Sequence, residues 1–370
     1  MTPTLKIGIL GTRGIPNTYG GFEQFAQYLS LGLIERGHKV WVYNSHDHPY
    51  KLSNYNGVNI IHCKDWEHKI GTAGQFIYDY NCIKDARNRD FDILLQLGYT
   101  SNSIWYFKWP RKAVNVLNMD GLEWKRSKYS KLTKRFLKYA EGLAAKNAEV
   151  LIADSVGIQA YLKSKYQKDS MYIPYGASVV EAQNSDVLQE YNIKPKEYYL
   201  LIARIEPENN IEMIIRGYLS SKKKHPLIIV GNSQNKFGQY LTEKYQDIDV
   251  RFVGAIYNQP TINTIRFYSS IYFHGHSVGG TNPSLLEAMA CECNIAAHDN
   301  VFNKAILNDD AFYFSSAEKI CQIIDETAGS PSVFVRTKNN IDKIQRFYTW
   351  DKIIDSYEKV FIGSFKSQNL

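Results

Sequence analysis

The sequence predicts an α/β protein with two consecutive doubly wound domains. Short apolar runs rich in β-branched and aromatic residues alternate with helical patterns, which is typical of parallel sheets with crossover helices. The runs stop at the polar stretch 181–197 and then begin again. A chain of 370 residues is long enough for two domains that each bury a core.

Each predicted strand is one of these runs. In the first half they are 6–10, 39–43, 58–63, 91–97, 113–118, 150–155 and 171–176, and in the second half 198–204, 226–231, 250–254, 270–275, 294–299 and 311–316. Ligands bind beyond the carboxyl ends of the strands in such sheets. The loops that follow the runs, and the cleft between two facing sheets, are therefore the expected sites.

Composition narrows the class of protein. The N-terminus lacks the pattern of a secretory signal and no apolar run is long enough for a membrane span, so we expect a cytoplasmic protein. Its five cysteines form no CxxC pair, which favours reduced packing residues. The net charge of +7 favours an anionic partner: phosphate groups, a membrane surface or nucleic acid. We do not expect nucleic-acid binding, because no recognised module is present.

The loop after the first strand, "GTRGIPNTYGGFE", is rich in glycine and opens a helix at about Phe22. Amides at that helix N-terminus would favour a phosphate. The G-x-G-x-x-G fingerprint of dinucleotide sites is not present. A tight turn with packing glycines is the alternative.

The second half opens with "LLIARIEPENN", in which Arg204 ends the predicted strand. Its guanidinium would suit a diphosphate. A surface salt bridge with Glu206 or Glu208 is the alternative.

The stretch "HSVGGTNPSLLEAMA" joins a strand to a helix. Gly279 and Gly280 free the backbone, Pro283 suits a first helical turn, and the amides of 281–284 form a helix N-terminus. Glu287 could accept hydrogen bonds from a ribose diol, or could cap amides of the first turn.

Two histidine pairs have alternate spacing, His46 with His48 and His274 with His276. Such spacing can bind a metal, but no carboxylate cluster accompanies either pair in the sequence. We expect no metal site.

Four segments in order, "GGFEQFAQYLSLGLIERGHKVWVY", "YIPYGAS", "ARIEPENN" and "NPSLLEAMAC", resemble family 4 retaining glycosyltransferases of the GT-B fold. The N-terminal "GTRGIPNTYGGFE" and the loop before Glu287 are similar to the subgroup that includes bacterial rhamnosyltransferases of surface-polysaccharide synthesis. The resemblance implies two Rossmann-like domains facing across a cleft. It places an acceptor-side domain at 1–185, a nucleotide-sugar domain at 186–345, and a helix at 346–370 that crosses back to the first.

The resemblance also implies roles for residues. Arg204 would bind the diphosphate as a catalytic group, and Glu287 would bind the nucleotide ribose. The other expected donor-binding residues, against the phosphate or the sugar, are Gly20, Gly21, Gly280, Thr281, Asn282 and Ser284. GT-B enzymes generally need no metal, so neither a metal nor another cofactor is expected.

Three positions depart from the family pattern. Asn209 stands where a lysine is usual, Asp120 where many relatives have a histidine near the sugar, and Gly279 where the first of two glutamates is usual. Asp120 could orient the donor sugar or the acceptor as a catalytic residue. A glycine in place of a carboxylate would suit the methyl group of a 6-deoxy sugar, which predicts dTDP-rhamnose as the donor.

The expected activity is transfer of a hexose, rhamnose or another, from a nucleotide diphosphate sugar to a glycan acceptor that is lipid-linked. A nucleotide-sugar epimerase and a non-catalytic nucleotide-sugar-binding subunit are the alternatives. The segment 124–143 alternates basic residues with Leu132, Phe136, Tyr139 and Leu143 at helical spacing. It predicts a helix that lies on an anionic membrane, at the inner face of the plasma membrane, or an ordinary helix with its apolar stripe in the core.

Overall fold

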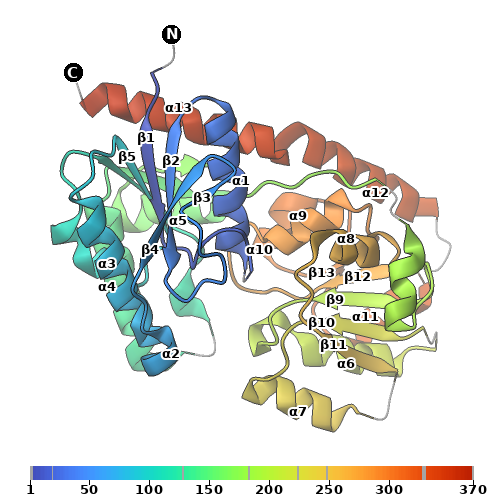
Figure 1. Ribbon diagram of the computed structural model, residues 1–370. Helices are drawn as coiled ribbons and strands as arrows, with labels where there is room; N and C mark the ends of the chain where they lie inside the picture. Colours follow the sequence, from blue (N-terminus) through green and yellow to red (C-terminus); the bar gives the residue numbers. More distant parts are fainter. Residues whose placement is uncertain are drawn as a thin grey trace. The chain divides into compact units, whose positions relative to one another are not determined.

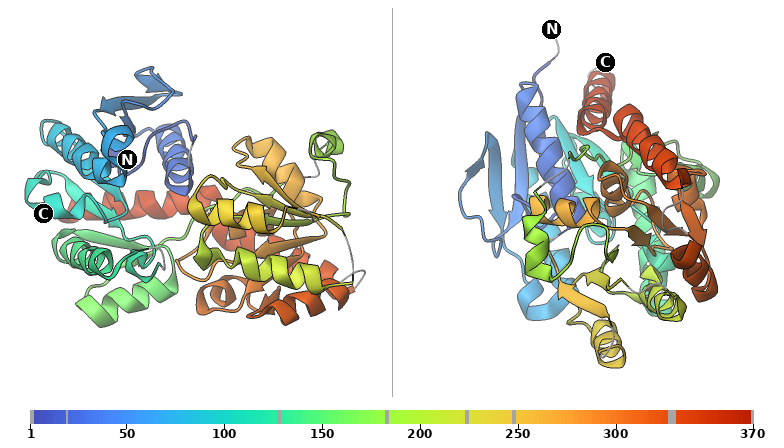
Figure 2. Two further views of the ribbon diagram at one scale, coloured as in Figure 1. Left: turned by 90° about the horizontal axis from the view of Figure 1, so that it is seen from below. Right: turned by 90° about the vertical axis from the view of Figure 1, so that its right-hand side faces the viewer.

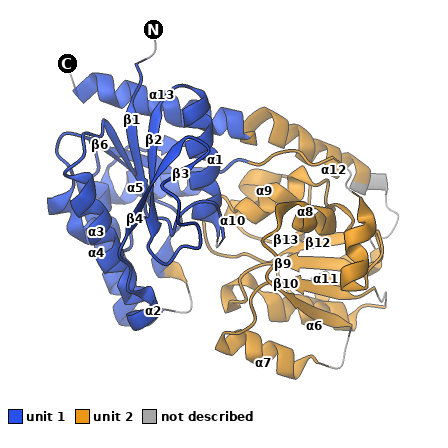
Figure 3. Ribbon diagram, viewed as in Figure 1, with its two compact units in different colours: residues 1–124, 129–176, 350–370 blue, residues 125–128, 177–349 orange. Residues whose placement is uncertain are grey.

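The computed structural model describes residues 3–368 except 19, 127–128, 182–183, 223–224, 247–248 and 327–330. The chain divides into two compact units (Figure 3). Unit 1 comprises 1–124, 129–176 and 350–370, and unit 2 comprises 125–128 and 177–349.

Unit 1 is built on an eight-stranded sheet in the order β3-β4-β2-β1-β5-β6-β7-β8 (Figure 1). All pairs are parallel except β3 with β4. Its strands are β1 (Lys6–Leu10), β2 (Lys39–Ser45), β3 (Asn54–Tyr55), β4 (Val58–Cys63), β5 (Ile93–Leu97), β6 (Val114–Asn118), β7 (Val150–Ala153) and β8 (Met171–Tyr172).

Helices of unit 1 form two groups. Buried residues of α3, α4 and α5 share one core cluster, whereas α1 packs against α13. Trp350 stacks on Tyr28 with centroids 4.4 Å apart, and the Asn118 side-chain amide donates to the Tyr357 hydroxyl at 3.0 Å. The C-terminal helix is therefore part of unit 1. The helices are α1 (Gly21–Glu35), α2 (Glu67–Ile70), η1 (Gly71–Ala73), α3 (Gly74–Ala86), η2 (Ser103–Lys108), η3 (Glu123–Lys125), α4 (Lys131–Asn147), α5 (Val156–Tyr166) and α13 (Trp350–Gln368).

Unit 2 has a six-stranded parallel sheet in the order β11-β10-β9-β12-β13-β14. Helices α6 and α11 pack together below this sheet in Figure 1, α8 and α9 lie above it, and Figure 2 gives two further views. The strands are β9 (Tyr199–Ile202), β10 (Leu227–Val230), β11 (Val250–Gly254), β12 (Ile271–His274), β13 (Ile295–His298) and β14 (Phe312–Phe314). The helices are η4 (Ser185–Tyr191), η5 (Pro207–Asn209), α6 (Ile211–Ser220), α7 (Lys236–Lys244), α8 (Gln259–Phe267), α9 (Pro283–Ala290), α10 (Val301–Leu307), α11 (Ala317–Glu326), α12 (Pro331–Lys343) and η6 (Ile344–Tyr348).

Both sheets are doubly wound, as the sequence predicts. The strand order reverses around β1, which lies between β2 and β5, and around β9, which lies between β10 and β12. Ligands bind at such switch points in open α/β sheets. The loops after β1, β9 and β12 are therefore the candidate ligand-binding loops.

The helix expected over 124–143 differs from the prediction. Helix α4 begins at Lys131, because the Ser130 side chain caps it by accepting from the Thr133 amide at 3.2 Å. The core side of α4 is made by Leu137, Ala140, Glu141, Ala144 and Ala145. In contrast, Leu132 is 78% and Tyr139 61% exposed, whereas Phe136 packs against the core cluster, so only part of the predicted apolar stripe lies in the core. Lys128 of the same segment lies outside the described residues.

Among the described residues, every helix is too short or too polar to cross a lipid bilayer.

Candidate functional site

Arg204 lies just beyond β9, two residues after the strand ends. Its side chain is exposed and forms no ion pair with any residue that the structure describes. The alternative salt bridge with Glu206 or Glu208 is therefore not formed. An exposed guanidinium at a switch point is available for an anionic ligand.

The loops after β9 and β12 hold each other in place. The Asn210 side-chain amide donates to the Gly275 carbonyl at 2.8 Å, and the Ser277 hydroxyl donates to the Glu208 carbonyl at 2.7 Å. A Cβ on Gly275 would lie 2.0 Å from the Asn209 oxygen, so only glycine permits this approach. The two loops form one tied surface next to Arg204.

Asn209, at the position of the family lysine, is buried. Its side-chain amide donates to the Arg204 carbonyl at 2.7 Å, so it fixes the loop. A second guanidinium is present nearby: Arg126 Nη1 lies 3.8 Å from Glu208 Oε1. The sequence analysis did not select Arg126. In the sequence it is only one of several basic residues in the segment 124–143.

The imidazoles of His274 and His276 stack with centroids 4.4 Å apart at the end of β12. Burial, and after it the nearby His298, lowers the pKa of His274 to about 3. Burial also lowers the pKa of His276, as do His274 and the guanidinium groups of Arg204 and Arg126. Both rings are uncharged at neutral pH, so the positive charge of this surface comes from the arginines.

The predicted anion-binding start of α9 is partly used by the protein itself. The Asn282 side chain caps the helix by accepting from the Ser284 amide at 2.9 Å, and the Ser284 and Tyr272 hydroxyls share a hydrogen bond of 2.6 Å. Gly280 and Thr281 precede this cap, and Thr281 is buried. The Ser284 amide is thus engaged before any ligand binds.

Gly279 has a φ of +136°, a conformation that side chains with a Cβ rarely adopt. A Cβ built there would meet nothing within 4 Å. The backbone itself therefore requires the glycine, and the space in front of it is open.

Glu287 forms an ion pair with Arg266 of α8 through Oε2 and Nη2. The side chains are 15% and 4% exposed, so the pair is largely desolvated. This contact replaces the predicted helix-capping alternative, because Asn282 supplies the cap. Sequence reasoning missed Arg266, which only the packing of α8 against α9 brings to Glu287. The pair fixes the direction of the carboxylate.

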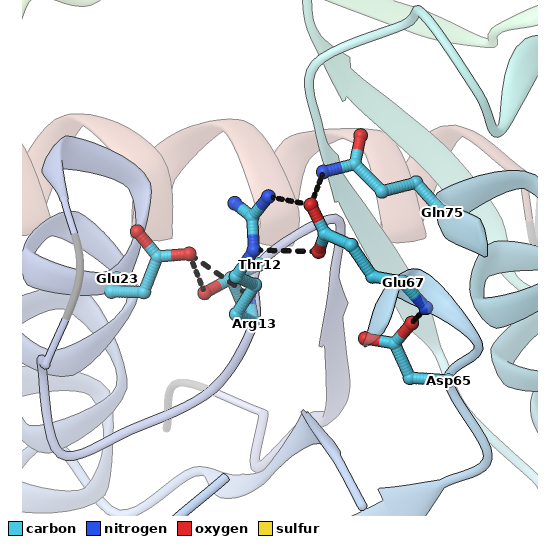
Figure 4. A network of polar contacts seen from close by, with 6 residues as sticks. All are labelled: Thr12, Arg13, Glu23, Asp65, Glu67 and Gln75. Atoms are coloured by element: carbon cyan, nitrogen blue, oxygen red, sulfur yellow. Dashed lines mark hydrogen bonds and ion pairs between the residues drawn. The ribbon is translucent and has the colours of Figure 1, made fainter. Parts of the chain in front are cut away.

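In unit 1, Gly20 is the residue that precedes α1. Figure 4 shows the contacts of Glu23, which lies in the first turn of this helix. Glu23 Oε1 accepts from the Thr12 hydroxyl at 3.2 Å and from the Arg13 amide at 2.9 Å. The Arg13 guanidinium in turn donates to both oxygens of Glu67 at 2.9 and 2.6 Å. A carboxylate therefore lies beside Gly20 and Gly21, where the sequence predicted a phosphate.

Asp120 follows β6 with a φ of 49°, and its amide donates to Asn118 Oδ1 at 3.0 Å. Buried Glu141 holds the segment after Asp120, since it accepts from the Trp124 indole at 3.0 Å and from the Tyr99 hydroxyl at 3.4 Å. Burial, then the charges of Asp120 and Asp154, and more weakly Glu23, raise the pKa of Tyr175. These carboxylates thus lie near one hydroxyl at the same end of the sheet.

Within the described ranges, one group has metal-ligand spacing: His46, Asp47 and His68. His46 Nδ1 accepts from the Asp65 amide at 2.9 Å, which leaves the ring proton on Nε2, and Nε2 faces Asp47 at 3.3 Å. This tautomer offers Asp47 a proton instead of offering a metal a lone pair. The predicted partner His48 instead contacts the Pro16 carbonyl through Nε2 at 3.1 Å.

Two families of known proteins match parts of this chain. Residues 184–326 match the family described as glycosyl transferases group 1, and residues 5–178 match a domain of unknown function, DUF1972. A search of curated protein sequences gives no match.

Solved structures resemble the whole chain. Sucrose-phosphate synthase from Thermosynechococcus elongatus has a TM-score of 0.83 at 16% identity, over 98% of this chain and 100% of that one. Anabaena HepE in complex with UDP has a TM-score of 0.75 at 13% identity, over 97% and 100%. An α,α-trehalose-phosphate synthase from Burkholderia vietnamiensis has a TM-score of 0.70 at 9% identity, over 99% and 100%.

Two parallel-sheet Rossmann-like domains with these neighbours define a GT-B fold. Unit 2 contains a glycosyltransferase group 1 domain, and the protein is a glycosyltransferase.

Proposed function

We propose that this enzyme transfers rhamnose, with retention of configuration, from a nucleoside diphosphate to a hydroxyl of a lipid-linked glycan in bacterial surface-polysaccharide synthesis. The main support for binding of the donor is the exposed guanidinium of Arg204. It lies in unit 2 next to the loops after β9 and β12, which are joined by hydrogen bonds. In this proposal Arg204 binds the diphosphate and Glu287 the ribose. Gly280, Thr281, Asn282 and Ser284 border the sugar and its phosphate.

The catalytic effect would come from charge. Negative charge grows on the leaving diphosphate, and preorganised donors that face it lower the barrier. Arg204 and the amides at the start of α9 supply such donors. The leaving phosphate would accept the proton of the acceptor hydroxyl, Asp120 would orient a sugar hydroxyl, and no metal or other cofactor would take part.

The nature of the sugar is proposed from Gly279. The open space in front of this glycine lacks the carboxylate that would bind a hydroxyl, and a buried carboxylate facing a methyl would lose a partner at a cost of ~1–3 kcal/mol. A 6-deoxy sugar therefore suits the site. Because the backbone at Gly279 also requires glycine for its own conformation, the donor must be tested separately.

The first prediction is a donor preference. Among dTDP-rhamnose, UDP-glucose and UDP-GlcNAc, dTDP-rhamnose should release nucleoside diphosphate with the highest kcat/KM, and EDTA should leave that rate unchanged. Competition between the three donors in one reaction checks the order. A higher kcat/KM for either UDP sugar would contradict the assignment of rhamnose. If no nucleotide sugar releases nucleoside diphosphate, the proposed sugar transfer is wrong.

We also propose that unit 1 binds an anionic membrane through α4 and η2, which pack against each other. Four large apolar side chains are exposed there: Tyr106, Phe107, Leu132 and Tyr139. Exposed basic residues accompany them: Arg111, Lys112, Lys131, Arg135 and Lys138. We call these nine residues the basic-aromatic face. Aromatic rings beside cations suit the boundary between anionic headgroups and acyl chains.

The second prediction concerns this face. The chain should float with vesicles that contain phosphatidylglycerol, less so at high salt, and poorly with phosphatidylcholine alone. Replacing Lys131, Arg135 and Lys138 by Ala should weaken binding by about fivefold per residue, since each cation near such a surface contributes about 1 kcal/mol. Exposed Val301 and Phe334 of unit 2 provide control substitutions to Ser. Equally poor flotation with both vesicles would contradict the proposal.

A further inference from the structure

His274 and His276 are two imidazoles at the end of β12 whose nitrogens the fold leaves largely without partners. His274 is 1% exposed, and neither of its ring nitrogens has a hydrogen-bond partner among the described residues. The same is true of Nδ1 of His276. A neutral imidazole carries one N–H, and a buried donor without an acceptor costs free energy. Hydrogen bonding within the described part of the fold therefore does not account for histidine at either position.

The rings of Tyr272, His274 and His276 form a stack on one face of β12 and its extension. Alternate residues of a strand share a face, and successive ring centroids lie 6.3 and 4.4 Å apart with the planes 22° and 18° from parallel. The His276 carbonyl also accepts from the side-chain amides of Asn300 and Asn303, at 3.0 and 3.2 Å. Both the ring and the backbone of His276 are therefore held in place by unit 2 itself.

The register of the sheet brings His276 to Arg204. Strands β9 and β12 pair in parallel, with Phe273 opposite Leu201. Continued for three residues, this register sets His276 opposite Arg204 and on the same face of the sheet. Hydrogen bonds join the loops after β9 and β12, so the two segments stay together beyond the ends of the strands. The imidazole and the guanidinium therefore border the same space.

The two ring nitrogens of His276 differ in exposure. Nδ1 is buried, whereas Nε2 reaches the surface of this half-buried residue. A proton on Nε2 can be shared with water or a ligand, and one on Nδ1 cannot, so the neutral ring carries its proton on Nε2. Burial, and after it the neighbouring His274 and the two guanidinium groups of this surface, lowers the pKa of His276. His276 thus presents an uncharged N–H donor.

The charges around this donor define the ligand group that suits it. Glu208 lies 3.8 Å from Arg126 and offsets its charge, whereas Arg204 forms no ion pair with a described residue. The potential beside Arg204 is therefore positive and favours an anionic oxygen.

We propose that His276 Nε2 donates a hydrogen bond to an oxygen of the same diphosphate that Arg204 binds. The inference rests on the proposed function and adds a binding residue to its donor site. Arg204 would supply charge, and His276 a hydrogen bond whose direction is fixed by the ring stack.

Two substitutions of His276 separate the donor from the ring. His276→Phe keeps an aromatic ring in the stack and removes both nitrogens. His276→Gln removes the ring but keeps an uncharged N–H donor. His274→Phe is the matched control, because it makes the same change in the neighbouring ring, whose nitrogens are both buried.

The measurements are the Tm of each variant and its Kd for UDP, dTDP, uridine and thymidine. We expect His276→Phe to bind UDP and dTDP about 10- to 150-fold more weakly and both nucleosides as the wild type does, since a hydrogen bond to a charged group is lost. His276→Gln should keep most of the affinity for the diphosphates, and His274→Phe all of it. In the wild-type chain with ¹⁵N-labelled histidine, UDP or dTDP should shift the Nε2 resonance of His276, whatever the stability of the variants.

Wild-type affinity of His276→Phe for both diphosphates, or an unshifted Nε2 resonance at saturating UDP and dTDP, would overturn the inference and leave the proposed function intact. An equal loss for the nucleosides, in His276→Gln or in His274→Phe would also overturn it, because the effect would then come from packing and not from the Nε2 donor. A wild-type chain that binds no nucleoside diphosphate would instead contradict the proposed function, and the inference with it.

Discussion

Replacing Glu287 by Gln is expected to weaken the binding of UDP and dTDP by ~1–3 kcal/mol, about 5- to 150-fold in Kd, because a charged acceptor for the ribose diol is lost. Isothermal titration calorimetry measures this directly. The proposal requires the effect on nucleoside diphosphates without any sugar, since Glu287 is assigned to the ribose. An unchanged Kd would remove that assignment.

The ion pair with Arg266 complicates the obvious variant. Glu287→Ala leaves a guanidinium that is 4% exposed without its partner, which costs about 3–5 kcal/mol of unfolding free energy. Arg266→Met is the matched control, because it breaks the same pair and keeps the carboxylate. If nucleotide affinity falls only in the Glu287 variants, the carboxylate binds the ligand. An equal loss in Arg266→Met would show that affinity depends on the intact pair and not on the carboxylate alone.

The second large effect is expected at Arg204. Arg204→Met should lower kcat/KM by about 10²–10³, or about 2.7–4 kcal/mol, which is the range for removing one preorganised donor from a developing negative charge. Its Tm should not change, because the side chain is exposed and pairs with no described residue. Steady-state release of nucleoside diphosphate and a thermal melt separate these two quantities.

Arg216 provides the control for Arg204. It is exposed on α6 of the same unit, so Arg216→Met removes the same charge from the domain without touching the loops after β9 and β12. A similar loss of rate in both variants would mean that Arg204 acts only through the net charge of the domain. The proposal predicts wild-type kinetics for Arg216→Met.

The sequence was a good guide to the sheets. The apolar runs that became β1, β9 and β12 are buried on both faces, and such strands produce continuous apolar patterns. Arg204 and Glu287 could be selected because each lies close after one of these runs. Only local pattern is needed for such inferences.

Contacts between elements could not be predicted in the same way. Arg266 pairs with Glu287 because α8 packs against α9, and Arg126 approaches Glu208 from a distant part of the chain. The sequence shows Glu23 close to two glycines, but its hydrogen bonds depend on where Thr12 and Arg13 lie in the fold. These distances are set by tertiary packing, which a single sequence does not encode locally.

Helix α4 shows how periodicity can mislead. Two stripes compete along it: Leu132 and Tyr139 on one side, and Leu137, Ala140 and Ala144 on the other. The larger residues suggested the apolar face, but the small alanines allow closer approach to the core, and it is their side that is buried.

The most direct test of the account is a crystal structure of the chain with UDP or dTDP bound. We predict the diphosphate within hydrogen-bond distance of Arg204 and the ribose hydroxyls against Glu287. A nucleotide that contacts neither Arg204 nor Glu287 would contradict the account.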